Sequence, residues 1–362
     1  MNRELKKYLI ILIKSLLFWT IAMCLHVFIR YLGVYDEPGI HVNFEYELSL
    51  IDNLKYGFLS GMLIGFFLSL VEYVFEKYLA YRIPMWLYFI FETIAYFIVL
   101  AFVLIIAFFF FNKENNTNYF TKEYLRLDNK VYWAYLIYAL YISIGLSFIR
   151  ISTEFLGGNT FWKILQGKYQ TPKEETRIFM FLDLKSSTTI AEKLGHFKHS
   201  KLIKDCFFDL NEILLNFKGE IYQYVGDEAV ITWIYTLGIQ NNNCTELFFS
   251  FRDRLKNRSP YYLKNYGIIP EFKAGIHGGK IITVEVGTIK KEIAYHGDTI
   301  NTAARIQSKC SEYQQQVIIS KELFEALNKD NSYKTIDLGS ILLRGKEVQL
   351  NLLGLKKYHN KK

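Results

Sequence analysis

The stretch that decides the fold begins with TRIFMFLDLKSSTTIAEKLG at Thr176–Gly195 and ends with KGEIYQYVGDEAVITW at Lys218–Trp233. Its first apolar run carries a single acid, Asp183, near its end, and a Ser/Thr-rich helix start follows at once. In the second part, apolar residues alternate on both sides of a Gly-Asp turn that holds Asp227, which is typical of a β-hairpin. If the hairpin pairs beside the first strand, Asp183 and Asp227 lie side by side at one edge of a sheet.

Two carboxylates in this arrangement indicate a cation site. They repel each other unless a divalent cation lies between them. The backbone N–H groups of Lys185–Thr188 open a helix, which is where phosphate binds most readily. Taken singly, each Asp is also a common cap or turn residue. The pair in these two contexts nevertheless favours metal binding.

Four segments together resemble the catalytic domain of class III nucleotidyl cyclases. They are FLDLKSST (Phe181–Thr188), YVGDE (Tyr224–Glu228), HGDTINTAARI (His296–Ile306) and LRGKEVQL (Leu343–Leu350). Their order and spacing match the family over roughly Thr176–Tyr358. The resemblance implies that Asp183 and Asp227, with the backbone carbonyl of Leu184, hold two divalent metal ions, Mg²⁺ or Mn²⁺.

The resemblance also implies catalytic and substrate-binding roles. Asn301 would orient the ribose, and Arg305 would stabilise the pentavalent phosphate with its planar, bidentate guanidinium. The two residues are four positions apart and share a helix face. A surface Asn and a solvated Arg are the alternative interpretation. Residues expected to contact the substrate phosphates are Ser186, Ser187, Thr188 and Lys346, the last of which is otherwise a hairpin-turn lysine.

The family's active unit is a head-to-tail dimer, in which one protomer supplies the metal acids and its partner supplies Asn and Arg. In this chain the two sets are expected at opposite ends of one catalytic domain. A homodimer with two shared active sites therefore follows from the resemblance, with isologous two-fold contacts.

The base-reading positions depart from the family pattern. Adenine-specific members usually have a Lys four residues before the second metal Asp, and an Asp or Thr seven before the Asn. This chain has Gln223 and Ala294 there. Gln both donates and accepts hydrogen bonds, so it can read several bases. ATP is the expected substrate, GTP is the next choice, and a pyrimidine triphosphate stays open.

The N-terminal half is predicted to span a membrane. Of 362 residues, 51% are hydrophobic and 17% aromatic, which is too high for one ordinary soluble domain, and the length suggests two modules. The net charge of +8 comes without a long basic run, so no nucleic-acid partner is expected. The four scattered cysteines indicate free buried thiols. Four stretches reach the length of about 20 residues that a bilayer requires: Tyr8–Ile29, Tyr56–Val74, Trp86–Phe111 and Val131–Ile149.

The flanking charges orient the first three spans. Basic residues precede the first span and follow the second, whereas the loop Gly33–Asn53 has none. The positive-inside rule then places the N-terminus in the cytoplasm. The loop Asn112–Lys130 carries four basic residues but is placed outside, because an even number of spans leaves the catalytic domain in the cytoplasm. This predicts a multi-pass protein of the inner (plasma) membrane. Glu72 and Glu92 are interpreted as reaching water near the cytoplasmic face, with a sensor role as the alternative.

The predicted fold class is an N-terminal all-α transmembrane bundle of four spans followed by an α+β, ferredoxin-like cyclase domain. The domains are 1–152, a linker or transducer at 153–175, and a catalytic domain at 176–362. The catalytic sheet is expected to be antiparallel, with helices on one face. Helices are expected at Ser187–Leu194, His199–Phe217, Asn243–Lys256 and Thr299–Ser308, and separate strands at Phe272–His277 and Ile281–Glu285.

The predicted function is conversion of ATP to 3′,5′-cyclic AMP and pyrophosphate. A guanylate or pyrimidine cyclase is the first alternative, and a catalytically degenerate nucleotide-binding sensor is the second. A diguanylate cyclase is disfavoured by the single Gly226 and by Asn301 and Arg305. A small transporter is disfavoured because few polar residues lie in the spans. The sequence leaves open the signal sensed, the basal activity and the receptor of the product.

Overall fold

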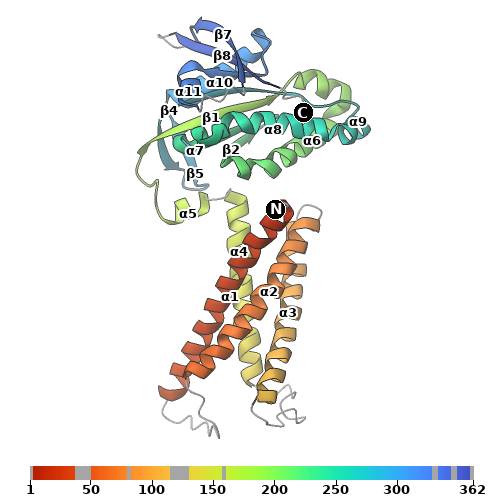
Figure 1. The fold of residues 1–362 in the computed structure, drawn as a ribbon, viewed down its shortest axis with the longest axis vertical. Helices are drawn as coiled ribbons and strands as arrows, with labels where there is room; N and C mark the ends of the chain where they lie inside the picture. Colours follow the sequence, from red (N-terminus) through yellow and green to blue (C-terminus); the bar gives the residue numbers. More distant parts are fainter. Residues whose placement is uncertain are drawn as a thin grey trace. The chain divides into compact units, whose positions relative to one another are not determined.

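The computed structural model describes residues 3–36, 50–79, 83–114, 130–156, 160–327, 333–343 and 349–358 (Figure 1). The chain divides into two compact units, Met1–Ser152 and Thr153–Lys362. The first is built from helices, and the second contains a large sheet with helices packed against it.

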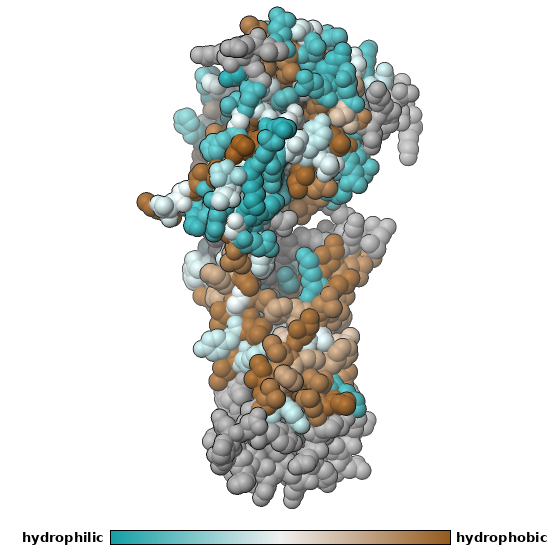
Figure 2. Space-filling view, turned by 90° about the vertical axis from the view of Figure 1, so that its left-hand side faces the viewer, coloured by the Kyte–Doolittle hydropathy of each residue, from teal (hydrophilic) through white to brown (hydrophobic). Residues whose placement is uncertain are grey.

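Long apolar helices form the first unit: α1 (Arg3–Asp36), α2 (Leu50–Tyr78), α3 (Met85–Glu114) and α4 (Lys130–Leu156). Three of them contain stretches long and apolar enough to cross a membrane, Tyr8–Ile29, Asn53–Phe75 and Trp86–Val103. Hydrophobic residues, in brown, accordingly predominate among the coloured residues on the visible face of this unit, with a few hydrophilic ones between them (Figure 2). Among the described residues, the apolar stretch in α4 is shorter, Leu140–Ile149, so the predicted fourth span is not among the candidates in that part of the chain.

Glycines on α2 set its packing against α1. Gly57, Gly61 and Gly65 recur every four residues and face α1. A Cβ at Gly61 would lie 2.6 Å from the Cα of Thr20, and one at Gly65 would lie 2.8 Å from the Cα of Leu16. Small residues at this spacing let two helix backbones approach closely. Such packing matters in a membrane, because lipid tails are as apolar as the helices and the hydrophobic effect does not drive the helices together. The sequence analysis did not identify this contact.

Polar groups are buried between the helices of the first unit. Glu92 on α3 is 0% exposed and accepts a hydrogen bond from the hydroxyl of Ser147 on α4 at 3.2 Å. The hydroxyl of Tyr138 on α4 donates to the carbonyl oxygen of Ala22 on α1 at 3.0 Å. The interpretation that Glu92 reaches water is therefore wrong, because neighbouring helices enclose its side chain.

The second unit contains an eight-stranded sheet in the order β2-β3-β1-β4-β6-β8-β7, with β5 paired to β4. The segment β1–α6–β2–β3–α8–β4 follows the β-α-β-β-α-β order of ferredoxin-like domains. The strands are β1 (Lys173–Leu184), β2 (Glu220–Val225), β3 (Glu228–Ile234), β4 (Phe272–Val286), β5 (Glu292–His296), β6 (Val317–Ser320), β7 (Tyr333–Ile341) and β8 (Leu350–Lys357).

Strand pairing and helix placement differ from the expectation in three respects. The sheet is mixed, because β4 and β6 pair in parallel. Strand β4 is continuous, so the two strands expected within it are one. Helices also cover both faces, since alternate residues of β1 face different cores. Ile178, Met180 and Leu182 face the core that includes α6 (Ser187–Leu214) and α8 (Asn243–Asn257), whereas Phe179 and Phe181 face α10 (Asp298–Glu312).

The helices of this unit largely match the expected positions. The range of α6 contains both helices expected between Ser187 and Phe217, and Gly195, at φ 74°, interrupts the helix between them. A 3₁₀ turn at Leu215–Phe217 follows it. The sequence analysis did not identify the short helices α7 (Tyr235–Ile239), α9 (Ser259–Tyr266) and α11 (Lys321–Ala326), nor the 3₁₀ turn Gln240–Asn242. Before the sheet, the linker forms α5 (Thr160–Leu165).

Candidate active site

Asp183 lies near the end of β1, between two cross-strand neighbours. In the antiparallel ladders its partner on β3 is Glu228 and its partner on β4 is Lys273. Asp227 occupies the turn that joins β2 to β3, directly before Glu228. The turn contains Gly226 at φ 60°, a left-handed conformation that favours glycine. The hairpin thus pairs beside the first strand and brings the two acids to the same end of the sheet.

Negative charge accumulates at this end of the sheet. The pKa of Glu228 is raised to about 7, first by burial and then by the carboxylates of Asp183 and Asp227, while Lys273 acts in the opposite sense. A third carboxyl group, that of Glu228, therefore lies near the two that the sequence predicted. Glu228 belongs to the YVGDE segment, but the sequence analysis gave it no role.

Two donors engage the same oxygen of Asp183. The ammonium of Lys273 lies 3.1 Å from Oδ2, and Nε2 of Gln307 donates a hydrogen bond to Oδ2 at 2.8 Å. Lys273 also donates to the hydroxyl of Ser311 at 3.2 Å. Oδ1 of Asp183 accepts no hydrogen bond from the residues that the structure describes. No motif pointed to Lys273 or Gln307, because both reach Asp183 only through the folding of β4 and α10.

Helix α10 reaches Asp183 because β4 has a glycine beneath it. A Cβ at Gly275 would lie 2.6 Å from the Cα of Gln307 and would overlap the backbone nitrogen of Gln307. Without that Cβ, the backbone of α10 rests directly on the strand. Gln307 is 7% exposed, and its amide extends to the neighbouring strand β1.

Asn301 and Arg305 lie on a different face of α10 from Gln307. The buried residues of α10 are Thr299, Thr302, Ala303, Ile306, Gln307 and Cys310. Asn301 is exposed, with Nδ2 3.4 Å from the carbonyl oxygen of Gly297, and Arg305 is half-buried. Thr299, in the first turn of α10, donates to the carbonyl oxygen of Lys280 on β4, whereas Gln307, farther along the helix, reaches Asp183. Among the described residues no contact joins Asn301 or Arg305 to either acid, so the separation of the two sets stays a prediction.

The start of α6 offers N–H groups beside Asp183. Ser186 is the N-cap at φ 58°, and Ser186 and Thr188 are exposed. The hydroxyl of Ser187 is 3.1 Å from Nε2 of His199. Leu184 is buried and ends β1. The N–H of Lys185 donates to the carbonyl oxygen of Glu271 at 2.8 Å and is not available to a phosphate. The expectation that this N–H takes part in phosphate binding is therefore wrong.

The two positions expected to read the base lie on strands that meet through aromatic neighbours. Gln223 is exposed on β2, and Ala294 is half-buried on β5. The adjacent residues Tyr222 and Tyr295 are in edge-to-face contact, with ring centroids 4.8 Å apart. The structure therefore brings the two segments together within one protomer. The remaining predicted contact, Lys346, lies outside the described residues.

The donor set at Asp183 fits divalent cations. Carboxylate oxygens are the ligands that Mg²⁺ and Mn²⁺ prefer. Asp183 lies opposite Glu228 in the β1–β3 ladder, and Asp227 directly precedes Glu228, so the carboxylates gather at this end of the sheet. Within the described ranges, no group of three or more His, Cys, Asp or Glu side chains forms a complete ligand cage. Mg²⁺ at phosphate-transfer sites is usually held by one or two carboxylates plus substrate phosphates, which agrees with this arrangement.

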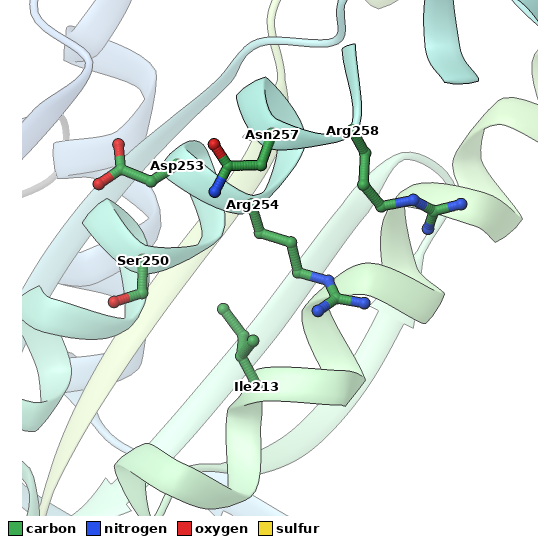
Figure 3. Close-up of a pocket in the computed structure, with 6 residues that line it drawn as sticks. All are labelled: Ile213, Ser250, Asp253, Arg254, Asn257 and Arg258. Atoms are coloured by element: carbon green, nitrogen blue, oxygen red, sulfur yellow. The ribbon is translucent and has the colours of Figure 1, made fainter. Parts of the chain in front are cut away.

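A hollow on the helical layer lies apart from these residues (Figure 3). It is lined by Ile213 of α6 and by residues at the C-terminal part of α8. Arg254 and Arg258 both contact Oδ1 of the fully buried Asp209, at 2.7 and 2.6 Å. These ion pairs join α6 to the end of α8. The hollow shares no lining residue with the candidate active site. Its two arginines are explained by a structural role, because their ion pairs hold α6 against the end of α8.

Comparisons with known proteins agree with the site. The family model of the adenylate and guanylate cyclase catalytic domain matches residues 169–356. Adenylate cyclase 2 of Rhizobium meliloti (strain 1021) is 34% identical over 220 residues, which cover 61% of this chain and 61% of that protein. The chain thus spans about three fifths of the length of that relative. Guanylate cyclase beta of Plasmodium falciparum (isolate 3D7) is 32% identical over 83 residues, which cover 23% of this chain and 2% of that protein.

Solved structures share the fold at low identity. A bacterial light-regulated adenylyl cyclase superposes with a TM-score of 0.53 at 18% identity, covering 65% of this chain and 69% of that one. The family match covers more than half of the sequence and includes both acids and α10. The chain therefore belongs to the adenylate and guanylate cyclase family.

Proposed function

We propose that this chain is a membrane-anchored nucleotidyl cyclase that converts ATP to 3′,5′-cyclic AMP and pyrophosphate by two-metal catalysis in a homodimer. The observation that carries the proposal is the pairing of β1 with the β2–β3 hairpin, which places Asp183 opposite Glu228 and next to the Asp227 turn. A helix start that can take phosphate begins beside it.

The reaction joins two parts of the same substrate. The ribose 3′-oxygen attacks the α-phosphorus, the bond to the β-phosphate oxygen breaks, pyrophosphate leaves, and the hydroxyl proton passes to solvent. Asp183 and Asp227 would hold the cations, which when bound lower the pKa of the 3′-hydroxyl and neutralise the leaving phosphates. The free first-turn N–H groups of α6 would accept part of the pyrophosphate charge.

Asn301 and Arg305 require a second protomer in this proposal. They face away from the surface of α10 that packs on β1 and β4, whereas Gln307 on the packed side reaches Asp183. In a head-to-tail homodimer, Asn301 of one protomer positions the ribose bound by the other. Arg305 then donates to the oxygens of the phosphorus under attack, where a planar guanidinium is well suited.

ATP is the proposed substrate because the R. meliloti relative is named an adenylate cyclase. Gln223 is free to read the base edge, since its side chain is exposed and Tyr222 and Tyr295 pack beside it. GTP is the second candidate, because Gln223 both donates and accepts hydrogen bonds and the P. falciparum relative is named a guanylate cyclase.

The proposal includes four membrane spans with the catalytic unit in the cytoplasm. Helix α4 is 27 residues long, about 40 Å at 1.5 Å per residue, which exceeds the thickness of the hydrocarbon core. It contacts α1 through Tyr138 and α3 through Ser147. A helix tied in this way to two apolar neighbours shares their environment. The basic residues that flank the first and second spans support the orientation.

The linker, residues 153–175, is proposed as the transducer. Lys163 on α5 pairs with Glu220 at the start of β2 at 2.9 Å, three residues before Gln223. Glu220 also lies 3.5 Å from the buried Arg177, whose guanidinium contacts the ring of Tyr295. A shift of α5 would therefore be felt at both base-reading strands. Lys163→Met should increase amide exchange in β2, whereas the more exposed Lys168→Met should not.

The first test is turnover by the full chain in detergent micelles. ATP, GTP, CTP and UTP would be supplied separately with Mn²⁺, and products identified by mass spectrometry. We expect cyclic AMP from ATP, and none from an Asp227→Asn variant that folds normally. A cyclic nucleotide formed from GTP, CTP or UTP instead would show that the proposed base specificity is wrong. Absence of every cyclic product from a folded protein would replace the proposal with a nucleotide-binding sensor.

A further inference from the structure

Asp183 has a counter-ion and an orienting amide that belong to the chain itself. Both contacts, the ammonium of Lys273 at 3.1 Å and the amide of Gln307 at 2.8 Å, are made to Oδ2. Oδ1 accepts no hydrogen bond from any described residue. The two oxygens of this carboxylate are therefore in different environments, one engaged by protein donors and one available to a ligand.

The two donors act on the carboxylate in different ways. Gln307 is neutral, 7% exposed and fixed by the contact of its backbone with β4 at Gly275, so it holds the plane of the carboxylate without competing with a cation for charge. Lys273 is positively charged, and its side chain and that of Asp183 are each 20% exposed. Its ammonium compensates the same negative charge that would attract a metal ion.

We infer that Lys273 and Gln307 set the cation affinity of Asp183 in opposite directions. Gln307 strengthens binding because an oriented carboxylate loses less rotational freedom when it ligates a cation. Lys273 weakens binding because a unit positive charge a few ångströms from a divalent ion repels it. Lys273 thereby disfavours a cation that arrives without the added negative charge of a triphosphate. The inference rests on the proposed metal role of Asp183, and it assigns positioning roles to two residues outside the predicted site.

The test measures cation binding without turnover. Mn²⁺ alone would be titrated into the nucleotide-free full chain in detergent micelles, with free Mn²⁺ followed by its electron paramagnetic resonance signal. The site is identified as the binding that Asp183→Asn removes. We expect Lys273→Met to bind Mn²⁺ about tenfold more tightly than the unmodified chain. We expect Gln307→Met to bind it about tenfold more weakly, since groups that orient a metal ligand typically contribute 10- to 100-fold.

Matched controls separate this effect from a general change of charge or packing. Lys280→Met removes a lysine from the same strand, but Lys280 pairs with Glu174 far along β1 and is 75% exposed, so its Mn²⁺ affinity should be unchanged. Gln316→Leu alters an exposed glutamine whose backbone carbonyl oxygen accepts a hydrogen bond from the N–H of Ala274, a contact that the substitution leaves in place. Thermal melting of every variant would confirm folding.

Three results would overturn the inference. If Lys273→Met and Gln307→Met both bind Mn²⁺ like the unmodified chain while Asp183→Asn does not bind, the positioning roles fail and the metal site stands. If both variants shift the affinity in the same direction, the opposing roles fail. If the unmodified chain binds no Mn²⁺ that depends on Asp183, the metal role and the inference fail together. Lys273→Met, at a half-buried position, decides the matter even if Gln307→Met does not fold.

Discussion

Gly275 on β4 and Gln307 on α10 are packed so closely that a Cβ on the glycine would lie 2.6 Å from the Cα of Gln307. This contact joins the sheet that carries Asp183 to the helix that carries Asn301 and Arg305. It also places the Gln307 amide at Asp183. The absence of a Cβ at Gly275 therefore controls the geometry of Asp183, the proposed metal ligand, and of the helix proposed to serve the partner's substrate.

Gly275→Ala is expected to lower both stability and turnover. The added Cβ meets backbone atoms that cannot rotate away, so α10 must move off the strand, and overpacking of this kind typically costs about 1–3 kcal/mol. Gly278→Ala on the same strand is the control, because its Cβ would meet only side-chain atoms, at 3.0 Å or more. Melting temperature and cyclic nucleotide production would be measured for both. Equal behaviour of the two variants would contradict the assigned role of Gly275.

Mixing two inactive variants should restore activity if the active sites are shared. Asp183→Ala removes a metal acid, and Arg305→Ala removes the guanidinium on the outward face of α10. A heterodimer of the two variants would contain one intact site, so we expect up to half of the unmodified turnover per heterodimer. The measurement is cyclic nucleotide formation after co-expression with separate affinity tags and tandem purification. A folded, dimeric mixture that stays inactive would refute the shared-site model.

The local parts of the site could be predicted from sequence. Asp183 ends an apolar run and Asp227 sits in a Gly-Asp turn, and both patterns depend on neighbouring residues alone. The alternation within β2 and β3 predicted the hairpin, and pairing beside β1 then followed. The main part of α6 was predicted because its apolar residues recur at helical spacing, whereas α10 was expected from the resemblance of its HGDTINTAARI segment.

The remaining parts depend on contacts between distant segments. Lys273 and Gln307 meet Asp183 only because β4 pairs with β1 and α10 rests on Gly275. Neither this strand pairing nor this helix packing produces a pattern among residues that are neighbours in the sequence. The parallel pairing of β4 with β6 likewise requires a crossover that alternation does not reveal. In the first unit, the glycine spacing of α2 was present in the sequence, but its partner helix was not evident without the packing.

Glu175 should make the catalytic unit sensitive to acid. Burial alone would raise the pKa of its carboxyl group, but hydrogen bonds from Tyr169 and Arg177 and the charge of Arg177 outweigh burial and lower the pKa from 4.5 to about 2. A lowered pKa in the folded state stabilises the protein above the unfolded pKa, and this stabilisation is lost as the pH falls from about 4.5 to 2. Glu175→Gln should therefore cost on the order of 2 kcal/mol at pH 7 and less than half of that at pH 3.

Exposure of buried thiols would measure this difference. Cys206, Cys244 and Cys310 are buried in the catalytic unit, so their reaction with a pyridyl disulfide in urea reports its unfolding, in a background where Cys24 is replaced by Ser. Glu174→Gln is the control, because that carboxylate is exposed and pairs with Lys280 at the surface. A Glu175→Gln penalty that is as large at pH 3 as at pH 7 would exclude the proposed ionic contribution.

Gly61→Ala should destabilise the helical unit, because its Cβ would lie 2.6 Å from the Cα of Thr20 and 2.7 Å from the carbonyl oxygen of Trp19. These are backbone atoms, so α1 and α2 must separate and lose contacts along their length. Gly145→Ala on α4 is the matched control, since nothing lies within 4 Å of its Cβ position and alanine has the higher helix propensity. Thermal unfolding in one detergent, followed by circular dichroism at 222 nm, would compare the two variants. We expect Gly61→Ala to melt several degrees below the unmodified chain and Gly145→Ala to melt no lower. The opposite order would show that close packing of α1 on α2 does not stabilise this unit.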